Sequence, residues 1–207
     1  MPRWKPTNKW EGLDVFVIGG GTSLKTFDWN LLKNECTIGC NDAYLLGSEI
    51  CKICVFGDPK WWKLHQHEIV KYDGLVFTTH GSFQRTKLDW VWTLHRKPSG
   101  LATDALAWNK NTGSQAINLA LILGAKRVCL LGFDMFLSND EANWHQNSIN
   151  KPDPTVYKSF IKGLGNLAKN LDNVFPGREI VNVTDDSRLD MFPKIGCDIF
   201  WKGRKES

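Results

Sequence analysis

Short apolar runs alternate with polar and helix-like segments along the chain. The runs have the length of strands and lie at residues 14–18, 36–40, 50–56, 75–78, 127–132 and 179–183. They carry few polar residues on either face, which is typical of parallel strands that are buried on both sides. Segments with helical spacing lie between them, at residues 23–33, 60–70, 115–123 and 157–171. The pattern predicts an α/β fold with three layers around a mostly parallel, Rossmann-like sheet.

Two parts of the chain depart from this alternation. Residues 83–110 are rich in tryptophan and have Lys97-Pro98-Ser99-Gly100 near their centre, so we expect an irregular insertion or lid there, outside the sheet. The basic tail at residues 202–205 is expected to fray. The chain of 207 residues otherwise fits a single domain, residues 1–207, that is long enough to bury a core.

Polar residues follow the strand-like runs at the points where the runs end. They are Gly19 to Ser23, Asn41, Asp42, Asp58, Thr79, His80, Asp134 and Thr184 to Ser187. In a parallel sheet all strands end at the same edge, which is where such folds bind ligands. The sequence therefore predicts a single ligand cleft along the carboxyl edge of the sheet.

The first run stops at three glycines, Gly19-Gly20-Gly21, before the polar pair Thr22 and Ser23. Glycines allow a close approach of the backbone to a ligand, and a capped helix that starts after them favours an anion such as a phosphate. The segment is not a dinucleotide fingerprint, because Leu24 stands at the position of its last glycine, and it is not a Walker loop. A nucleotide pocket and a simple tight turn explain this local pattern equally well.

Composition narrows the class of protein. Hydrophobic residues make up 42% and charged residues 23% of the chain, and the net charge is +4, which suits a globular protein with a phosphate-bearing substrate. No apolar run reaches the ~18 residues of a membrane span. The N-terminus resembles no signal peptide, so we expect a cytoplasmic protein. We expect the six cysteines to be free thiols and most of the ten tryptophans to lie in the core.

Two blocks of sequence resemble a known family. The segment Gly19 to Lys25, with Asp28 and Cys40-Asn41-Asp42, resembles the G-N-G-P-S-L…C-N opening of the bacterial lipooligosaccharide sialyltransferases. It is similar also to the related hydroxymethylpterin diphosphokinase-like (MptE-like, DUF115) proteins. Thr112-Gly113-Ser114, the apolar helix and Leu131-Gly132-Phe133-Asp134 look like the second shared block, and residues 182–193 a weaker third. The resemblance implies the sialyltransferase-like fold, a variant of GT-A.

The resemblance also implies a nucleotide-binding domain and its site residues. The nucleotide would be held by Gly19, Gly20, Gly21, Thr22, Ser23, Asn41, Asp42, Asp58, Thr112, Gly113 and Ser114. The donor would be a nucleotide sugar of the CMP or UDP type. His145 is implied as the base on the acceptor hydroxyl, together with Asp134 as a catalytic residue. An imidazole pKa of about 6.5 suits that task, although without the resemblance the sequence favours an ordinary surface histidine.

The sequence departs from the family where tyrosines bind the departing phosphate. Phe136 stands at the first such position, and the next tyrosine is Tyr157. Gly20 and Thr22 stand where asparagine and proline are usual. We therefore expect the leaving group to be stabilised by a lysine or arginine of residues 83–110, or by a metal.

Three functions remain open at this point. The first is a nucleotide-sugar-dependent glycosyltransferase that needs no cofactor, acting on a hydroxyl of a glycan or of modified DNA. The second is a diphosphokinase on a hydroxymethyl compound, in which Mg²⁺ would be bound by aspartates. The candidates for this role are Asp42, Asp58, Asp134, Asp185 and Asp186. The third is a non-catalytic module that binds a nucleotide or nucleic acid, with tryptophans stacking on bases. The sequence also leaves a homo-oligomer open.

Overall fold

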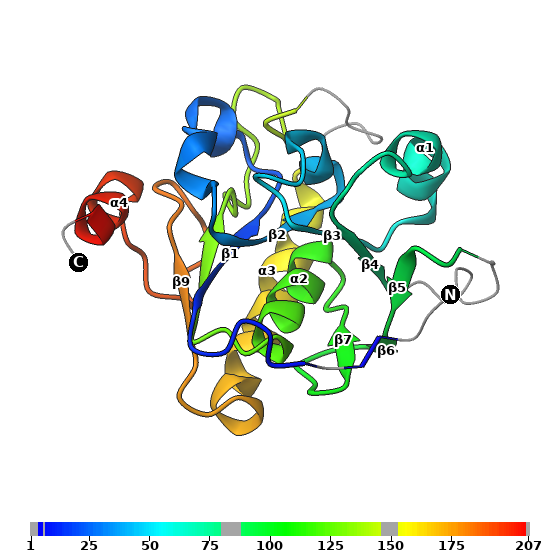
Figure 1. Ribbon diagram of the computed structural model, residues 1–207. Helices are drawn as coiled ribbons and strands as arrows, with labels where there is room; N and C mark the ends of the chain where they lie inside the picture. The colour runs from blue at the N-terminus through cyan, green and yellow to red at the C-terminus, as the bar shows by residue number, and fades with distance from the viewer. Residues whose placement is uncertain (1–3, 6, 80–87, 146–152, 206–207) are drawn as a thin grey trace.

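A parallel sheet of seven strands forms the centre of the molecule (Figure 1). The computed structural model describes residues 4–5, 7–79, 88–145 and 153–205. The strand order is β5-β4-β3-β2-β1-β8-β9, and every neighbouring pair is parallel. The bounds are β1 Asp14–Ile18, β2 Cys36–Cys40, β3 Ile53–Phe56, β4 Leu75–Thr78, β5 Val91–Thr93, β8 Arg127–Leu131 and β9 Glu179–Asn182. The predicted parallel sheet is confirmed.

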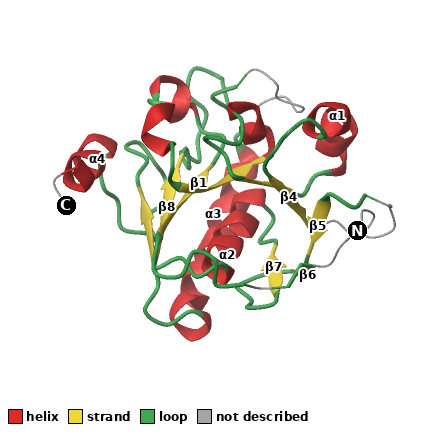
Figure 2. Ribbon diagram, in the orientation of Figure 1, coloured by secondary structure: helices red, strands yellow, loops and turns green. Residues whose placement is uncertain are grey.

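Helices cover both faces of this sheet, as Figure 2 shows for α1 and α2. The α-helices are α1 Pro59–Ile69, α2 Thr112–Ile122, α3 Thr155–Val174 and α4 Cys197–Lys205. Three 3-10 helices are η1 Thr22–Thr26, η2 Trp29–Leu32 and η3 Asn41–Leu46. Helices α2 and α3 pack on one face, whereas η1, η2, α1 and α4 pack on the other. The three-layer α/β architecture is therefore confirmed.

Alternate residues of β1 fill the two halves of the core. Val15 and Val17 pack on the side of α2, while Phe16 and Ile18 pack on the opposite side. All four side chains are fully buried, as expected for a central strand. The ring of Phe16 stacks on Trp201 of α4, with centroids 5.1 Å apart. Helix α2 is buried from Ser114 to Ile122, which explains why its sequence is apolar on every face.

The structure corrects the prediction for residues 83–110, as far as it describes them. Residues 88–110 contain β5, which joins the edge of the main sheet, and two further strands, β6 His95–Lys97 and β7 Ala105–Ala107, which pair with each other. Each strand has three residues, and all three side chains of β6 are exposed. Strands of three residues are too short to show a periodic pattern, and β6 is also polar throughout.

The structure also corrects the predictions for residues 23–33 and for the tail at residues 202–205. Residues 23–33 form two 3-10 turns instead of one helix, because Asp28 interrupts the segment and accepts a hydrogen bond from the backbone of Asn30. The tail at 202–205 belongs to α4, where Arg204 makes ion pairs with Asp14 and Glu35.

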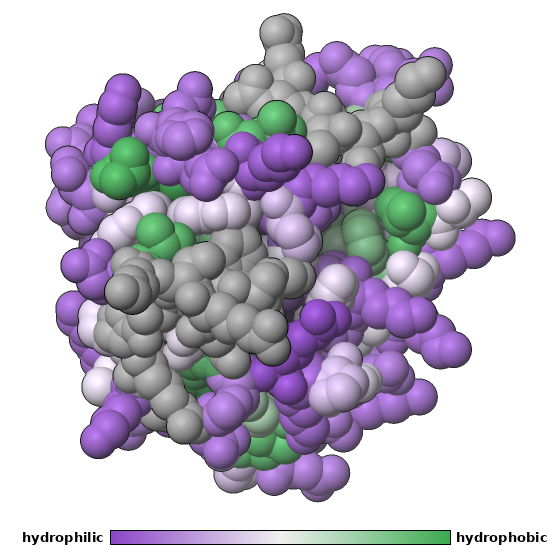
Figure 3. Space-filling model, turned by 90° about the vertical axis from the view of Figure 1, so that its right-hand side faces the viewer, coloured by the Kyte–Doolittle hydropathy of each residue, from purple (hydrophilic) through white to green (hydrophobic). Residues whose placement is uncertain are grey.

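The described part of the surface is mostly polar. On the face that Figure 3 shows, the coloured side chains are largely hydrophilic, and the hydrophobic ones form small separate patches. None of the described helices has the length and apolar character that crossing a membrane would require.

Candidate active site

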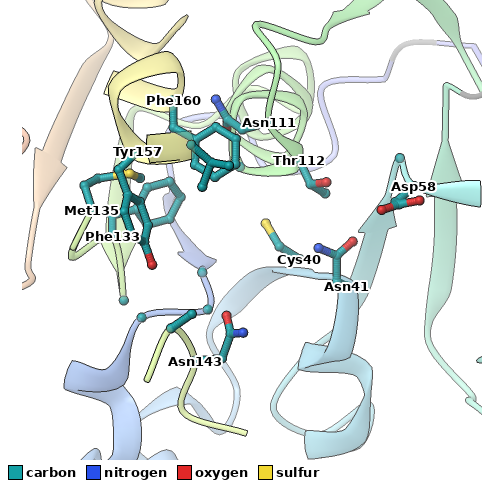
Figure 4. A pocket seen from close by; sticks show the side chains of 18 of the residues that line it. Cys40, Asn41, Asp58, Asn111, Thr112, Phe133, Met135, Asn143, Tyr157 and Phe160 are labelled. Carbon is teal, nitrogen blue, oxygen red and sulfur yellow. The ribbon is translucent and has the colours of Figure 1, made fainter. Parts of the chain in front are cut away.

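A cavity of about 800 Å³ opens at the carboxyl edge of the sheet (Figure 4). It lies where the chain reverses its direction across the sheet, since β2 follows on one side of β1 and β8 lies on the other. Such a switch point is the usual ligand site of open α/β sheets. The segments after β1, β2, β3 and β8 line the cavity together with the first residues of α2 and α3. Gly20, Asn41, Thr112 and Asp134 all meet there.

The glycine turn packs tightly against the segment that follows β8. The amide of Gly19 donates to Leu131 O at 2.8 Å, and that of Gly21 donates to Gly132 O at 2.8 Å. A Cβ atom on Gly19 would lie 2.5 Å from Gly132 O, and one on Gly21 would collide with the carboxylate of Asp134. The glycines are thus needed for a tight turn, and all three also line the cavity. The segment is therefore a tight turn that also borders the cavity, and its binding of a nucleotide stays a prediction.

Asp134 fastens this turn to β8. Its carboxylate accepts hydrogen bonds from Ser23 Oγ at 2.6 Å, from Ser23 N at 2.9 Å and from Thr22 Oγ1 at 3.2 Å. The side chain is only 2% exposed. Asp134 lines the cavity, whereas Thr22 and Ser23 do not line it, and Ser23 is exposed. This arrangement makes Asp134 a residue that positions the glycine turn.

Asn41 and Asp42 open η3 at the end of β2. Asn41 adopts a left-handed conformation with φ of 52°, and its Oδ1 is buried without a hydrogen-bond partner among the described residues. The Asn41 side chain lines the cavity beside Cys40 (Figure 4). A buried amide oxygen without a partner is costly, so this atom is well placed to bind a donor on a ligand.

His145 and Asp42 form a close pair at the base of the cavity. Nδ1 of His145 lies 3.0 Å from Oδ2 of Asp42, and the two side chains are 13% and 2% exposed. This contact is within ion-pair distance, but Nδ1 of His145 makes no hydrogen bond of good geometry to a described residue. Trp61 Nε1 donates to the other oxygen of Asp42. Burial raises the pKa of Asp42, but its contacts with His145 and Trp61 outweigh that effect, and the pKa falls below its usual value.

The N-terminus of α2 forms another part of the wall. Asn111 caps this helix by accepting a hydrogen bond from Ser114 N at 2.7 Å. Thr112 and Gly113 line the cavity, whereas Ser114 is fully buried behind them. Just before the cap, Lys110 also lines the cavity, with a left-handed φ of 63°. It is the one lysine or arginine among the described lining residues, so it supplies a cation beside the helix N-terminus.

The remaining wall is aromatic and apolar. Phe133, Met135, Tyr157 and Phe160 lie together on one side in Figure 4, across from Asn41 and Asp58. Burial, followed by the nearby charge of Asp134, raises the pKa of Tyr157. The cavity therefore has one polar wall and one apolar wall.

The sequence patterns did not predict several of the residues that line the cavity. Tyr157 and Phe160 come from α3, more than 20 positions after β8, and Trp61, Trp108 and Asn143 are neither glycines nor polar ends of strands. The helical stripe at 157–171 predicted their helix but gave no sign that its first turn faces a ligand cleft.

Three of the five aspartates proposed for a metal, Asp42, Asp58 and Asp134, line the cavity, and the other two do not. Asp58 lines the cavity but caps α1 by accepting from Lys60 N at 2.7 Å. Asp185 accepts from Cys197 N at 2.9 Å, and neither it nor Asp186 lines the cavity. In the part of the chain that the structure describes, no three histidine, cysteine or acidic side chains are arranged to bind a metal ion.

The fold resembles those of solved glycosyltransferases. The sialyltransferase CstII from Campylobacter jejuni, solved with cytidine-5'-monophosphate, matches with a TM-score of 0.56 and 18% identity, over 89% of this chain and 85% of that one. The monofunctional α-2,3-sialyltransferase Cst-I from the same organism matches with a TM-score of 0.59 and 17% identity, over 94% and 84%. The fold is that of the sialyltransferases. The fold implied by the two sequence blocks is thereby confirmed.

A third solved structure has the same arrangement. The MAf glycosyltransferase from Magnetospirillum magneticum AMB-1 matches with a TM-score of 0.61 and 12% identity, over 95% of this chain but 37% of that longer one. No protein-family model and no curated protein matches the sequence. At these identities the likeness concerns the fold, and residue roles must be argued from the cavity itself.

Proposed function

We propose that the protein is a glycosyltransferase that moves a sugar from a nucleotide donor to a hydroxyl of an acceptor. The observation that carries this proposal is the pairing of His145 with the buried carboxylate of Asp42 inside a cavity that also holds a glycine turn and a helix N-terminus. A histidine with one ring nitrogen facing a carboxylate keeps the other nitrogen free to accept a proton. The sialyltransferase-like fold supports the same reaction class.

In this mechanism Nε2 of His145 takes the proton of the acceptor hydroxyl. The hydroxyl oxygen forms a bond to the anomeric carbon of the donor sugar as the bond from that carbon to the phosphate oxygen breaks. The electron pair of that bond leaves with the nucleotide, and the imidazolium is stabilised by Asp42 at 3.0 Å. A single displacement of this kind inverts the configuration of the anomeric carbon.

We propose that Lys110 and the N-terminus of α2 bind the departing phosphate. The backbone amides at Thr112 and Gly113 belong to the first turn of α2, where N–H groups lack helical partners. Lys110 adds a full positive charge to the same wall. Together they take the place of the tyrosine that is absent at Phe136, and no metal ion is needed for the step.

The two walls of the cavity suit the two parts of such a donor. Asn41 and the glycine turn would bind the polar nucleotide, and the aromatic wall would pack against the flat or apolar parts of the substrates. CstII has been solved with CMP and with CMP-3FNeuAc. A donor of the CMP or UDP type is our proposal for this chain, with a glycan or a modified DNA base as acceptor.

A thermal-shift panel tests this function first. CMP-, UDP- and GDP-sugars are compared with ATP plus Mg²⁺, because a ligand that binds only the folded state raises the midpoint of unfolding. We expect a nucleotide sugar to give the largest shift and His145→Gln to retain that shift while losing transfer. Release of nucleotide from the donor, measured with and without acceptor, reports turnover. A shift with ATP and Mg²⁺ alone would overturn the proposal in favour of the diphosphokinase.

One observation favours the diphosphokinase as a second candidate. Four aspartates line the cavity: Asp42, Asp58, Asp134 and Asp153. Against this, Asp42 and Asp134 already bind protein donors with both carboxylate oxygens, which leaves little capacity for Mg²⁺. The non-catalytic module is distinguished by nucleotide binding without turnover of any donor.

A further inference from the structure

A buried chain of polar side chains leads away from the cavity behind His145. Asp42 lies between two histidines, because Nε2 of His65 is 3.4 Å from Oδ1 while Nδ1 of His145 is 3.0 Å from Oδ2. Nδ1 of His65 lies 2.9 Å from the hydroxyl of Tyr44, which is also 3.2 Å from Oε2 of Glu68. The chain ends at a second hollow of about 220 Å³, which Tyr44 and Glu68 help to line.

Three of these groups lie almost out of reach of water, whereas Glu68 at the end of the chain is exposed. Asp42, Tyr44 and His65 are 2%, 5% and 6% exposed. The ring of Trp61 stacks on His65, with centroids 4.7 Å apart and planes within 15°, and its Nε1 binds Asp42. Apolar side chains at these positions would avoid the cost of burying so many polar groups. Because this cost is accepted, we infer that the network has a role besides packing.

The hydrogen-bond donors and acceptors around the Tyr44 hydroxyl indicate a role for His65. The hydroxyl of Tyr44 has one proton but two acceptor neighbours, Nδ1 of His65 and the carboxylate of Glu68. Both contacts are satisfied when His65 donates from Nδ1 to the Tyr44 oxygen and Tyr44 donates to Glu68. Nε2 of His65 faces Oδ1 of Asp42 at 3.4 Å, so a second proton on this nitrogen would give His65 a positive charge between two carboxylates.

A positive charge on His65 would affect the protonation of His145, the other histidine that contacts Asp42. With His65 charged, the carboxylate of Asp42 is neutralised on one side and attracts a proton onto His145 less strongly. Oδ2 of Asp42 lies 3.0 Å from Nδ1 of His145, so a proton on Nδ1 would face the carboxylate and Nε2 would be free toward the cavity. A base must be neutral before it can take a proton from a hydroxyl.

We propose that His65 is a positioning residue for His145: by donating to Asp42 and to Tyr44 it holds His145 in the neutral form with the proton on Nδ1. The inference rests on the proposed role of His145 as the base. The titratable groups that face the two rings are Asp42, Tyr44, Glu68 and Cys54, and those around the cavity are Asp58, Lys110, Asp134, Asp153 and Tyr157.

The experiment follows the titration of each histidine by NMR, from the ring Cε1–H signals of the full chain. We expect His65→Gln to raise the titration midpoint of His145 by about one pH unit, because Asp42 loses its other cation. Asp42→Asn should lower that midpoint and change the ring tautomer. The matched control is His67→Gln, the same substitution at an exposed position two residues further along α1, which should leave the midpoint unchanged.

Two further measurements keep the outcomes distinct. If His65→Gln does not fold, Tyr44→Phe removes the acceptor of His65 Nδ1 and should raise the His145 midpoint by a smaller amount. An unchanged or lowered midpoint in a folded variant would overturn the inference. If a donor has been identified, the acid limb of kcat/KM should move to higher pH by the same amount in His65→Gln. A midpoint that moves in a protein that turns over no donor would uphold the network and reject the proposed transferase.

Discussion

Asp134, at the end of β8, accepts hydrogen bonds from both the backbone and the side chain of Ser23, in the first turn after β1. The two residues are 111 positions apart, and their contact joins the central strands of the sheet at the edge where the cavity opens. The same carboxylate also accepts from Thr22. The shape of the glycine turn is thus set by a side chain from the other half of the chain.

Removing this carboxylate should loosen the turn. Asp134→Ala leaves one amide and two hydroxyls without the charged acceptor of their part-buried hydrogen bonds, at a cost of about 1–3 kcal/mol in the free energy of unfolding. Urea denaturation measures this cost, and nucleotide binding should weaken with it. Asp140→Asn, in an exposed loop of the same segment, is the control. Equal stabilities of the two variants would contradict the role given to Asp134.

The glycines of the turn should differ in their tolerance of a methyl group. A Cβ atom on Gly21 collides with Asp134 and lies 2.7 Å from Gly132 O, so Gly21→Ala requires the backbone to shift. A Cβ atom on Gly20 meets only the side-chain oxygen of Asn143, at 2.6 Å, and that side chain can rotate away. We expect a clearly lower thermal midpoint for Gly21→Ala than for Gly20→Ala. Gly203→Ala, in α4 with no atom near its Cβ position, should be neutral or stabilising. Similar midpoints for all three variants would refute this account.

The ends of the strands could be predicted because they follow from local sequence. β1 starts and stops where its apolar run does, and parallel strands necessarily bring their polar ends to one edge. Asn41, Asp42, Asp58 and Asp134 reached the cavity wall for that reason.

The rest of the site depends on contacts that no local pattern reveals. His65 stands on the buried face of α1, four positions after Trp61, where its partner Asp42 comes from a different element. Lys110 lies at the end of a segment whose strands, of three residues each, are too short to be recognised from their pattern, although a cation from that segment was expected. Tertiary packing decides such positions, so a single sequence cannot show them.

The lowered pKa of Asp42 predicts how stability depends on pH. A carboxylate whose pKa is lower in the folded state contributes stability above its unfolded pKa of about 3.9, and this contribution is lost as the pH falls through the folded value. The free energy of unfolding of the wild type should therefore exceed that of Asp42→Asn near neutral pH, and the difference should shrink below about pH 4. Urea denaturation between pH 3 and pH 6 measures it. A difference that stays constant over this range would show that Asp42 has no lowered pKa in the fold.

Lys110 should contribute to the binding of phosphate and not of the nucleoside. Loss of a charged hydrogen bond in the cavity costs about 1.5–3 kcal/mol, so Lys110→Gln should weaken a nucleoside monophosphate at least about tenfold. The matched control is Lys63→Gln on the exposed face of α1, away from the cavity. Binding of the nucleoside without phosphate, measured by calorimetry, should change little in either variant. If Lys110→Gln weakened nucleoside and nucleotide equally, Lys110 would act through the shape of the α2 N-terminus and not through its charge.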